Sequence, residues 1–184
     1  ELGSGGIARV YLATQADLGN RTVVVKATPY SSYEASVLGR LNHPNIVPIH
    51  FADEVAEHNL SFLCMPYHGR STLVDLIDLA FEKGLPRGGE VVRQAALCWL
   101  PRQERELATT KHSARGRRLS RTTYIDAVIG IALKMAEALQ YSHERGIAHG
   151  DLKPSNVLLT PAGEPLLLDF NLSTLHVYCN TLQA

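Results

Sequence analysis

Two stretches near the carboxyl end of the sequence decide the fold: His149-Gly150-Asp151-Leu152-Lys153-Pro154-Ser155-Asn156 and Leu167-Leu168-Asp169-Phe170-Asn171. In the first, an Asp, a Lys two residues later and an Asn three residues beyond form a loop whose polar groups can converge on one phosphate. Two apolar runs, separated by a Pro-Ala-Gly turn, follow this loop and predict a β-hairpin. That hairpin would carry the acidic group of Asp169 back beside the loop.

This pattern resembles the catalytic loop and the metal-binding motif of eukaryotic-type protein kinases, written HRDxxxxN and DFG in that family. The resemblance implies an α+β, two-lobed fold. A small antiparallel-sheet lobe with the hinge would span residues 1–68, and an incomplete, mainly helical lobe would span residues 69–184. Lys153, placed after Asp-Leu, is similar to the serine/threonine subgroup, and the hinge and the Asp-Phe-Asn motif are most similar to bacterial members.

The first residues of the chain resemble the glycine-rich loop of these kinases. Glycines allow a tight hairpin to bring backbone N–H groups against nucleotide phosphates, although a Gly-Ser-Gly-Gly run by itself also fits an ordinary turn. Alanine stands where the third glycine of the family motif would be. The resemblance implies that ATP is covered by Leu2, Gly3, Ser4, Gly5, Gly6, Ile7, Ala8 and Val10.

A strand is predicted over Arg21–Lys26, followed by a short helix over Ser32–Leu41 and an HPNIV connection. In the family pattern, Lys26 would hold the α- and β-phosphates of ATP and pair with Glu34 of the helix. Val24 stands where alanine is usual and would narrow the roof of the adenine pocket.

The segment Phe62–Gly69 resembles the fifth strand and the hinge between the lobes. Met65 would lie behind the adenine. Pro66 would offer its backbone carbonyl, which proline retains, and His68 would offer its N–H, with Tyr67 between them. The resemblance further implies that the adenine ring is sandwiched by Val10, Val24 and Leu158.

The resemblance assigns the chemistry to the loop and the hairpin. Asp151 would orient the substrate hydroxyl and accept its proton, and Lys153 would stabilise charge on the transferring γ-phosphoryl group. Asn156 and Asp169 would hold Mg²⁺. Gly150 departs from the family, because many kinases carry there an arginine that binds an activation-loop phosphate. A packing spine between the lobes would consist of Leu38, Ile49, His149 and Phe170.

The larger lobe is predicted to contain a helix over Ser71–Phe81 and a long amphipathic helix over residues 124–144. Between them, residues 82–122 hold ten Lys or Arg against four Glu, with little periodicity outside Val91–Leu100. This segment predicts a flexible, solvent-exposed insertion. The apolar face of the long helix consists of Ile125, Val128, Ile129, Ala132, Leu133, Ala136 and Leu139. We expect this face to be uncovered, because the later helices that would cover it are absent.

Composition limits the function classes. The 184 residues are 45% hydrophobic and carry no formal net charge, so bulk electrostatics indicates neither a nucleic acid nor a membrane partner. Three cysteines without C-x-x-C spacing favour a reducing compartment, which we take as the cytoplasm. No run reaches membrane-spanning length. The chain starts at Glu1 and stops soon after Asp169, so we expect a fragment that is unstable and weak or inactive by itself.

Three functions fit these observations. The first is an ATP- and Mg²⁺-dependent kinase that acts on serine or threonine of protein substrates. The second is a phosphotransferase of the aminoglycoside kinase type, which also uses a His-Gly-Asp loop. The third is a pseudokinase that acts only through contacts. His43-Pro44-Asn45, the glycine-rich loop and Lys153-Pro154 favour the first.

Overall fold

The computed structural model describes residues 3–5, 8–29, 37–82, 84–111 and 118–170. It divides the chain into two compact units, which we call the sheet unit (Glu1–Tyr67) and the helical unit (His68–Asn171). The boundary lies one residue before the lobe boundary that the sequence predicts.

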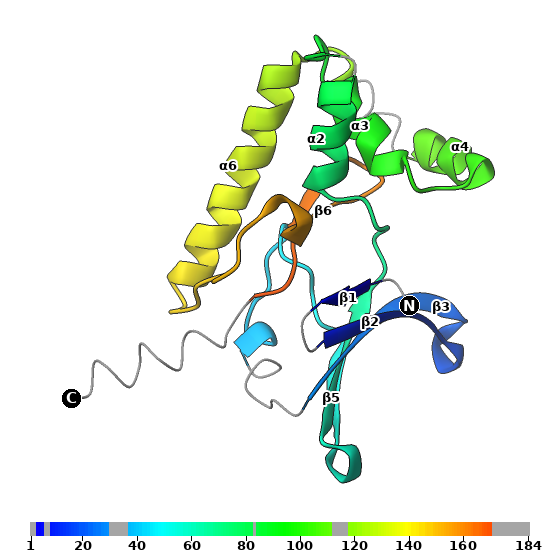
Figure 1. Ribbon diagram of the computed structural model, residues 1–184, viewed down its shortest axis with the longest axis vertical. Helices are drawn as coiled ribbons and strands as arrows, with labels where there is room; N and C mark the ends of the chain where they lie inside the picture. Colours follow the sequence, from blue (N-terminus) through cyan, green and yellow to red (C-terminus); the bar gives the residue numbers. More distant parts are fainter. Residues whose placement is uncertain (1–2, 6–7, 30–36, 83, 112–117, 171–184) are drawn as a thin grey trace. The chain divides into compact units, whose positions relative to one another are not determined.

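The sheet unit is built on one antiparallel sheet with the strand order β1-β2-β3-β5-β4, which confirms the small sheet lobe expected from the sequence (Figure 1). Hairpins join β2 to β3 and β4 to β5, whereas β3 and β5 are neighbours in the sheet but not in the sequence. The β2–β3 connection includes Gly19 and Asn20 with positive φ of 70° and 57°. The elements are β1 Gly3–Gly5, β2 Ala8–Gln15, the 3-10 turn η1 Ala16–Leu18, β3 Arg21–Pro29, β4 Phe51–Val55, the 3-10 turn η2 Ala56–His58 and β5 Leu60–Pro66.

Apolar side chains of the central strands and of the β3–β4 connection are buried in the sheet unit. Val23 and Leu63 come from the strands, and Val37, Leu41 and Ile46 come from the connection. Residues 37 and 38 are helical, as expected for the end of the predicted helix over residues 32–41. The earlier part of that helix, with Glu34, lies outside the described residues.

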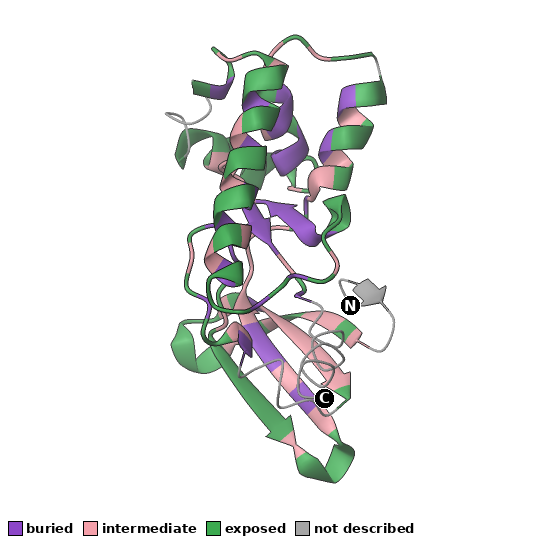
Figure 2. Cartoon of the chain, turned by 90° about the vertical axis from the view of Figure 1, so that its left-hand side faces the viewer, coloured by how far each residue is buried: buried purple, intermediate pink, exposed green. Residues whose placement is uncertain are grey.

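The helical unit surrounds a short β-hairpin with helices. Its elements are α2 Leu73–Glu82, α3 Glu90–Leu97, α4 Arg102–Lys111, α6 Tyr124–His143, the 3-10 turn η3 Pro154–Asn156, β6 Val157–Leu159 and β7 Pro165–Leu167. The bounds of α2 and α6 agree closely with the predicted helices. The hairpin is confirmed, with Val157 opposite Leu167. Both of its strands are buried along their whole length and are purple in Figure 2.

The prediction of a flexible insertion over residues 82–122 is wrong for the first half of this segment. The described part of this segment includes the helices α3 and α4, and α3 packs against α2 with its apolar side chains inside the unit. Val92 and Ala95 are 0% exposed. In contrast, α4 has no buried residue, so the expectation of a solvated segment holds for that helix. A core helix therefore lies within a segment whose charge suggested an exposed loop.

The two ends of the insertion are joined by backbone pairing. Gly88 forms an antiparallel bridge with Thr123, and the amide of Gly89 donates to the Thr122 carbonyl at 2.9 Å. The Tyr124 amide donates to the carbonyl of Arg87 at 3.1 Å. Residues 87–89 and 122–124 therefore lie side by side, with α3 and α4 between them in the sequence.

The surroundings of two glycines, Gly89 at this junction and Gly130 in α6, predict opposite effects of a substitution by alanine. A Cβ at Gly89 would lie 2.8 Å from the Leu119 carbonyl oxygen, whereas one at Gly130 in α6 would meet nothing within 4 Å. We expect Gly89→Ala to lower the free energy of unfolding by about 1–3 kcal/mol. Gly130→Ala should raise it by about 0.5–1 kcal/mol, because alanine favours a helix interior. Urea unfolding followed by circular dichroism measures both, and equal midpoints would contradict the close packing at Gly89.

The apolar face of α6 that the sequence indicates is exposed, as expected for a face without its cover, and another face of the helix is buried. Ala127, Ile131 and Met135 point into the unit, whereas Ile129 is 52% exposed and Leu133 is 60% exposed. The helix carries apolar residues on two faces, and the inward face combines the large side chains of Ile131 and Met135 with the small side chains of Ala127 and Ala138. Periodicity alone could not decide between these faces. Among the described helices, none combines the length and the apolar character needed to cross a bilayer.

Candidate active site

The loop between α6 and β6 is shaped by local backbone interactions. Gly150 has φ of 74°, a left-handed conformation that glycine adopts without steric cost. Pro154 begins the 3-10 turn η3, and the amide of Asn156 donates to the Lys153 carbonyl at 2.9 Å. These two features fold the loop back on itself, so that polar side chains five residues apart can meet.

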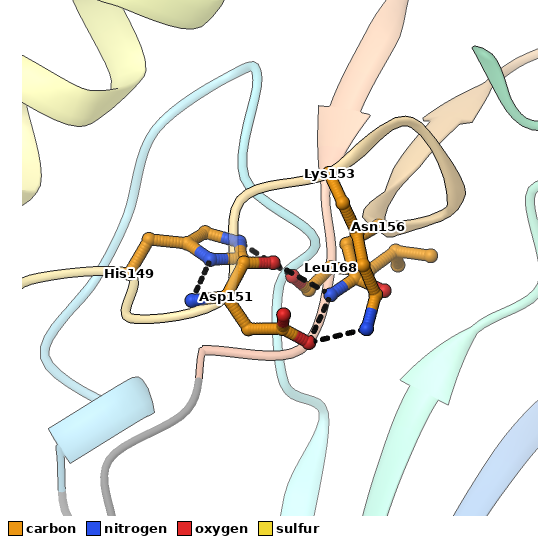
Figure 3. A network of polar contacts seen from close by, with 5 residues as sticks. All are labelled: His149, Asp151, Lys153, Asn156 and Leu168. Atoms are coloured by element: carbon orange, nitrogen blue, oxygen red, sulfur yellow. Dashed lines mark hydrogen bonds and ion pairs between the residues drawn. The ribbon is translucent and has the colours of Figure 1, made fainter. Parts of the chain in front are cut away.

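The side chains of Asp151, Lys153 and Asn156 form one hydrogen-bonded network (Figure 3). Lys153 Nζ donates to Asp151 Oδ2 at 2.6 Å. Asn156 Nδ2 donates to the same oxygen at 3.0 Å and to the Asp151 backbone carbonyl at 2.8 Å. Asn156 is buried, whereas the Asp151 and Lys153 side chains are 41% and 51% exposed. The structure thus brings together three of the four residues assigned to catalysis and metal binding.

The Asp151 carboxylate is held in its ionised form. The hydrogen bond from Lys153 is the largest cause of a lowered pKa for this group, and the Asn156 amide and the charge of Lys153 act in the same direction, while desolvation opposes them. An ionised carboxylate with solvent access can orient a hydroxyl group and accept its proton.

His149 links the loop to the strand that precedes Asp169. Its Nε2 lies 2.8 Å from the Leu168 carbonyl oxygen, and its Nδ1 accepts from the Asp151 amide at 3.4 Å. Both contacts are satisfied by the neutral tautomer with the proton on Nε2. The ring also lies 4.5 Å, centroid to centroid, from the ring of Phe170. His149 therefore fixes both the Asp151 backbone and the segment around Asp169.

Acidification should destabilise the protein through His149. Burial holds the pKa of His149 below its ordinary value of 6.5, so the unfolded chain takes up a proton at a pH where the folded ring stays neutral. Stability present above pH 6.5 is then lost as the pH falls below it. We expect the stability difference between wild type and His149→Gln, measured by urea unfolding, to shrink with falling pH.

The control for this experiment is His143→Gln, which replaces an exposed histidine at the end of α6. It should keep the wild-type decline in stability. Parallel declines in wild type and His149→Gln would contradict the role given to the buried ring.

The residues expected to hold Mg²⁺ have side chains whose oxygen atoms suit that ion. The Asn156 amide nitrogen is bound to Asp151, which leaves the amide oxygen as the ligating atom. The Leu168 amide donates to the Asn156 carbonyl at 2.9 Å, so Asp169 follows directly on this contact. Mg²⁺ is commonly held by one or two carboxylates together with substrate phosphates. Within the described residues no cluster of three or more His, Cys, Asp or Glu is placed to hold a metal.

Asp169 has a backbone conformation that is uncommon outside glycine. Its φ is 50°, in the left-handed region where Asp and Asn are enriched among non-glycine residues. Such conformations persist where the surrounding structure holds them, and they cluster at functional sites. Here the preceding residue is held by Asn156 and His149.

In the sheet unit, four of the residues assigned to ATP lie on one face of the sheet. Val10 is opposite Lys26 in the β2–β3 register, and Val24 is opposite Met65 in the β3–β5 register. Val24 and Lys26 are two residues apart in β3, so they share a face. All four are partly buried. This common face agrees with a shared role, which the resemblance alone assigned.

Other expected site residues are placed only in part. The backbone of Gly3, Ser4 and Gly5 forms β1, and Gly5 pairs with Ala8 of β2, as a glycine-rich hairpin requires. Pro66 ends β5 and is followed by Tyr67 and His68. Leu158 lies in β6. Four residues lie outside the described part of the chain, so the Lys26–Glu34 pair stays a prediction: Leu2, Gly6, Ile7 and Glu34.

The spine that the resemblance implies is seen only within the helical unit. His149 and Phe170 are in ring contact and both are 3% exposed. Leu38 and Ile49 belong to the sheet unit, and their part in the spine stays a prediction.

Thr72 and Asp75 were not identified from the sequence as residues near the site. Thr72 forms an isolated antiparallel bridge with Leu158, and the Thr72 amide donates to Asp75 Oδ2 at 2.7 Å. The signal was present, because a Thr followed three residues later by an acidic residue before an apolar run indicates a helix amino-terminus. That signal locates the start of α2, but it does not reveal the pairing with β6.

Comparison with known proteins supports the resemblance. Residues 105–183 match the family described as the protein kinase domain. A probable serine/threonine-protein kinase of Streptomyces coelicolor is 31% identical over 94% of this chain. Serine/threonine-protein kinase PknK of Mycobacterium tuberculosis is 30% identical over the same share. The chain spans 21% of the first relative and 13% of the second.

Among solved structures, a point mutant of the Mycobacterium tuberculosis PknI kinase domain has the same fold. Its TM-score with this chain is 0.53 at 23% identity, and the likeness covers 92% of this chain and 56% of that one. The sheet unit and the helical unit are thus those of a two-lobed kinase fold. The matches in sequence and this likeness in fold show that the chain is similar to members of the protein kinase family.

Proposed function

We propose that the full-length protein transfers the γ-phosphoryl group of ATP to serine or threonine hydroxyls of protein substrates. The observation that carries this proposal is the network of Asp151, Lys153 and Asn156, held beside Asp169 by the Asn156–Leu168 backbone contact. Phosphoryl transfer requires little covalent chemistry from the protein and depends on positioning and charge neutralisation. This network supplies a carboxylate, an ammonium group and an amide in fixed positions.

Each group of the loop has a role in the proposal. The ionised Asp151 carboxylate orients the acceptor hydroxyl and takes its proton. Lys153 is held next to Asp151 and offers its ammonium charge to the transferring group. Asn156 and Asp169 would hold Mg²⁺, which when bound neutralises charge on the ATP phosphates.

The nucleotide-binding residues extend the same proposal. Lys26 would hold phosphates, and the glycine-rich hairpin would cover them with backbone amides. The adenine would be contacted by Val10, Val24, Met65, Leu158 and the backbone of residues 66–68. The shared sheet face of Val10, Val24, Lys26 and Met65 supports this assignment. The proposed cytoplasmic location is supported by Cys64 and Cys98, which form no disulfide.

Incubating the purified full-length protein with Mg²⁺ and γ-labelled ATP tests the function. Protein acceptors and an aminoglycoside are supplied in separate reactions, and labelled protein is hydrolysed to identify the phosphorylated amino acid. Label on serine or threonine supports the proposal. Label on the aminoglycoside would assign a small-molecule phosphotransferase, and ATP binding without transfer to any acceptor would assign a pseudokinase.

A further inference from the structure

The carboxyl end of α3 holds the segment that leads into α2. We call residues 70–75 the α2 entry segment. The indole N–H of Trp99 donates to Asp75 Oδ1 at 2.7 Å, and the hydroxyl of Ser71 donates to the Ala96 carbonyl at 3.2 Å. Ser71 is also 2% exposed, so this second contact is inside the unit. The insertion is thus attached to the entry segment near both ends of that segment.

A third contact involves charge. The Arg70 guanidinium carbon lies over the Trp99 ring, 4.5 Å from its centroid. This is the geometry of a cation–π interaction. Trp99 therefore contacts the first and the last residue of the entry segment with different parts of one ring system.

The entry segment is itself paired with the strand that follows the catalytic loop. Thr72 forms an antiparallel bridge with Leu158, and the amide of Leu159 donates to the Ser71 carbonyl at 2.7 Å. Leu158 lies two residues after Asn156, and the proposed function assigns it a contact with the adenine. A shift of the entry segment would therefore also displace β6.

Asp75 connects the two sets of contacts. Its Oδ1 accepts from Trp99, while its Oδ2 accepts from the Thr72 amide at 2.7 Å and from the Thr72 hydroxyl at 3.2 Å. One carboxylate thus joins the indole to the residue that pairs with Leu158. A carboxylate bound on both oxygens has a fixed orientation, and loss of the indole N–H leaves only the contacts of Oδ2 with Thr72 to hold it.

We propose that Trp99 is a positioning residue for nucleotide binding, which acts through Asp75 and Arg70 to hold the entry segment against β6. The inference rests on the proposed function, in which Leu158 contacts the adenine. Trp99 lies in the insertion over residues 82–122, to which the kinase resemblance assigns no role. The insertion would then contribute to ATP affinity although none of its residues contacts ATP.

The exposure of Trp99 makes the proposal testable without unfolding the protein. The side chain is 53% exposed, so its truncation leaves no large cavity. In Trp99→Leu the N–H donor and the aromatic ring are both lost, whereas Trp99→Phe keeps a ring beneath Arg70 and loses only the donor. The two variants separate the contact with Asp75 from the contact with Arg70.

Calorimetric titration of the full-length protein with Mg-ATP gives the Kd of each variant, and steady-state kinetics gives kcat and KM. For Trp99→Leu we expect the Kd and KM for ATP to rise about threefold to tenfold. This is the scale expected when one or two contacts, each about as strong as a hydrogen bond, are lost. Its kcat should stay within about twofold of wild type, because the Asp151 network is untouched. The Kd of Trp99→Phe for Mg-ATP should lie between the Kd of wild type and that of Trp99→Leu.

Leu107→Ala is the matched control, because Leu107 is 64% exposed on α4 in the same insertion. It should leave Kd, KM and kcat unchanged. An unchanged Kd in Trp99→Leu would overturn the inference, as would a lower kcat with an unchanged KM, which indicates only a loss of folded enzyme. If wild type itself does not bind Mg-ATP, the proposed function fails instead.

Discussion

Replacing Asp151 by Asn is expected to lower turnover by about two or more orders of magnitude, the scale for losing an acid–base or positioning group. The amide that replaces the carboxylate cannot take a proton from the acceptor hydroxyl. It also loses the ion pair with Lys153, whose Nζ lies 2.6 Å from Asp151 Oδ2. Mg-ATP affinity should stay nearly unchanged, because the proposed nucleotide contacts come from other residues. Steady-state kinetics with a protein acceptor and titration with Mg-ATP measure the two effects.

A matched control for this variant is Asp78→Asn, the same exchange on an exposed position of α2. It should change neither turnover nor ATP affinity. Turnover of Asp151→Asn within a few-fold of wild type would show that another group accepts the proton, and the assignment of the catalytic loop would be wrong.

The parts of the site that could be predicted are those in which spacing along the chain determines contact. Asp151 and Asn156 meet because the loop between them is short and closes on a 3-10 turn. The β6–β7 hairpin follows from two apolar runs around a turn that contains Gly163, whose φ is 76°. In such cases a few residues carry enough information to fix the geometry.

The parts that could not be predicted depend on contacts between distant residues. The bridge of Thr72 with Leu158 joins segments far apart in the chain, and no local pattern encodes it. For α6, two apolar faces were available, and the partners α3 and β7 decided which one is buried. Sequence periodicity reports that a face is apolar, and packing determines whether it is used.

The helix α3 was not predicted, because the residues around it in the sequence are highly charged. In α3 the apolar residues have helical spacing, yet the segment around them is rich in Arg and Lys. The charge of the whole segment therefore suggested solvation, although α3 within it forms part of the core. This difference can be tested directly with one residue of α3.

Replacing Val92 by Asp is expected to destabilise the protein by about 3–5 kcal/mol, the cost of an uncompensated buried charge. Val92 is 0% exposed. Its Cγ1 lies 3.6 Å from the position that a Cβ on Gly163 would occupy, so α3 packs closely on the turn of the β6–β7 hairpin. Loss of this size is a large part of the roughly 5–15 kcal/mol that stabilises a typical domain. Urea unfolding of the full-length protein followed by circular dichroism measures it.

The matched control is Leu107→Asp, the same kind of change on the exposed helix α4. A surface substitution of this type should shift the free energy of unfolding by no more than about 0.5 kcal/mol. A flexible insertion would tolerate both variants equally, because neither side chain would be removed from water. A packed α3 beside a solvated α4 requires a large loss for Val92→Asp alone. Equal unfolding midpoints would therefore restore the original expectation of a mobile segment over residues 82–122.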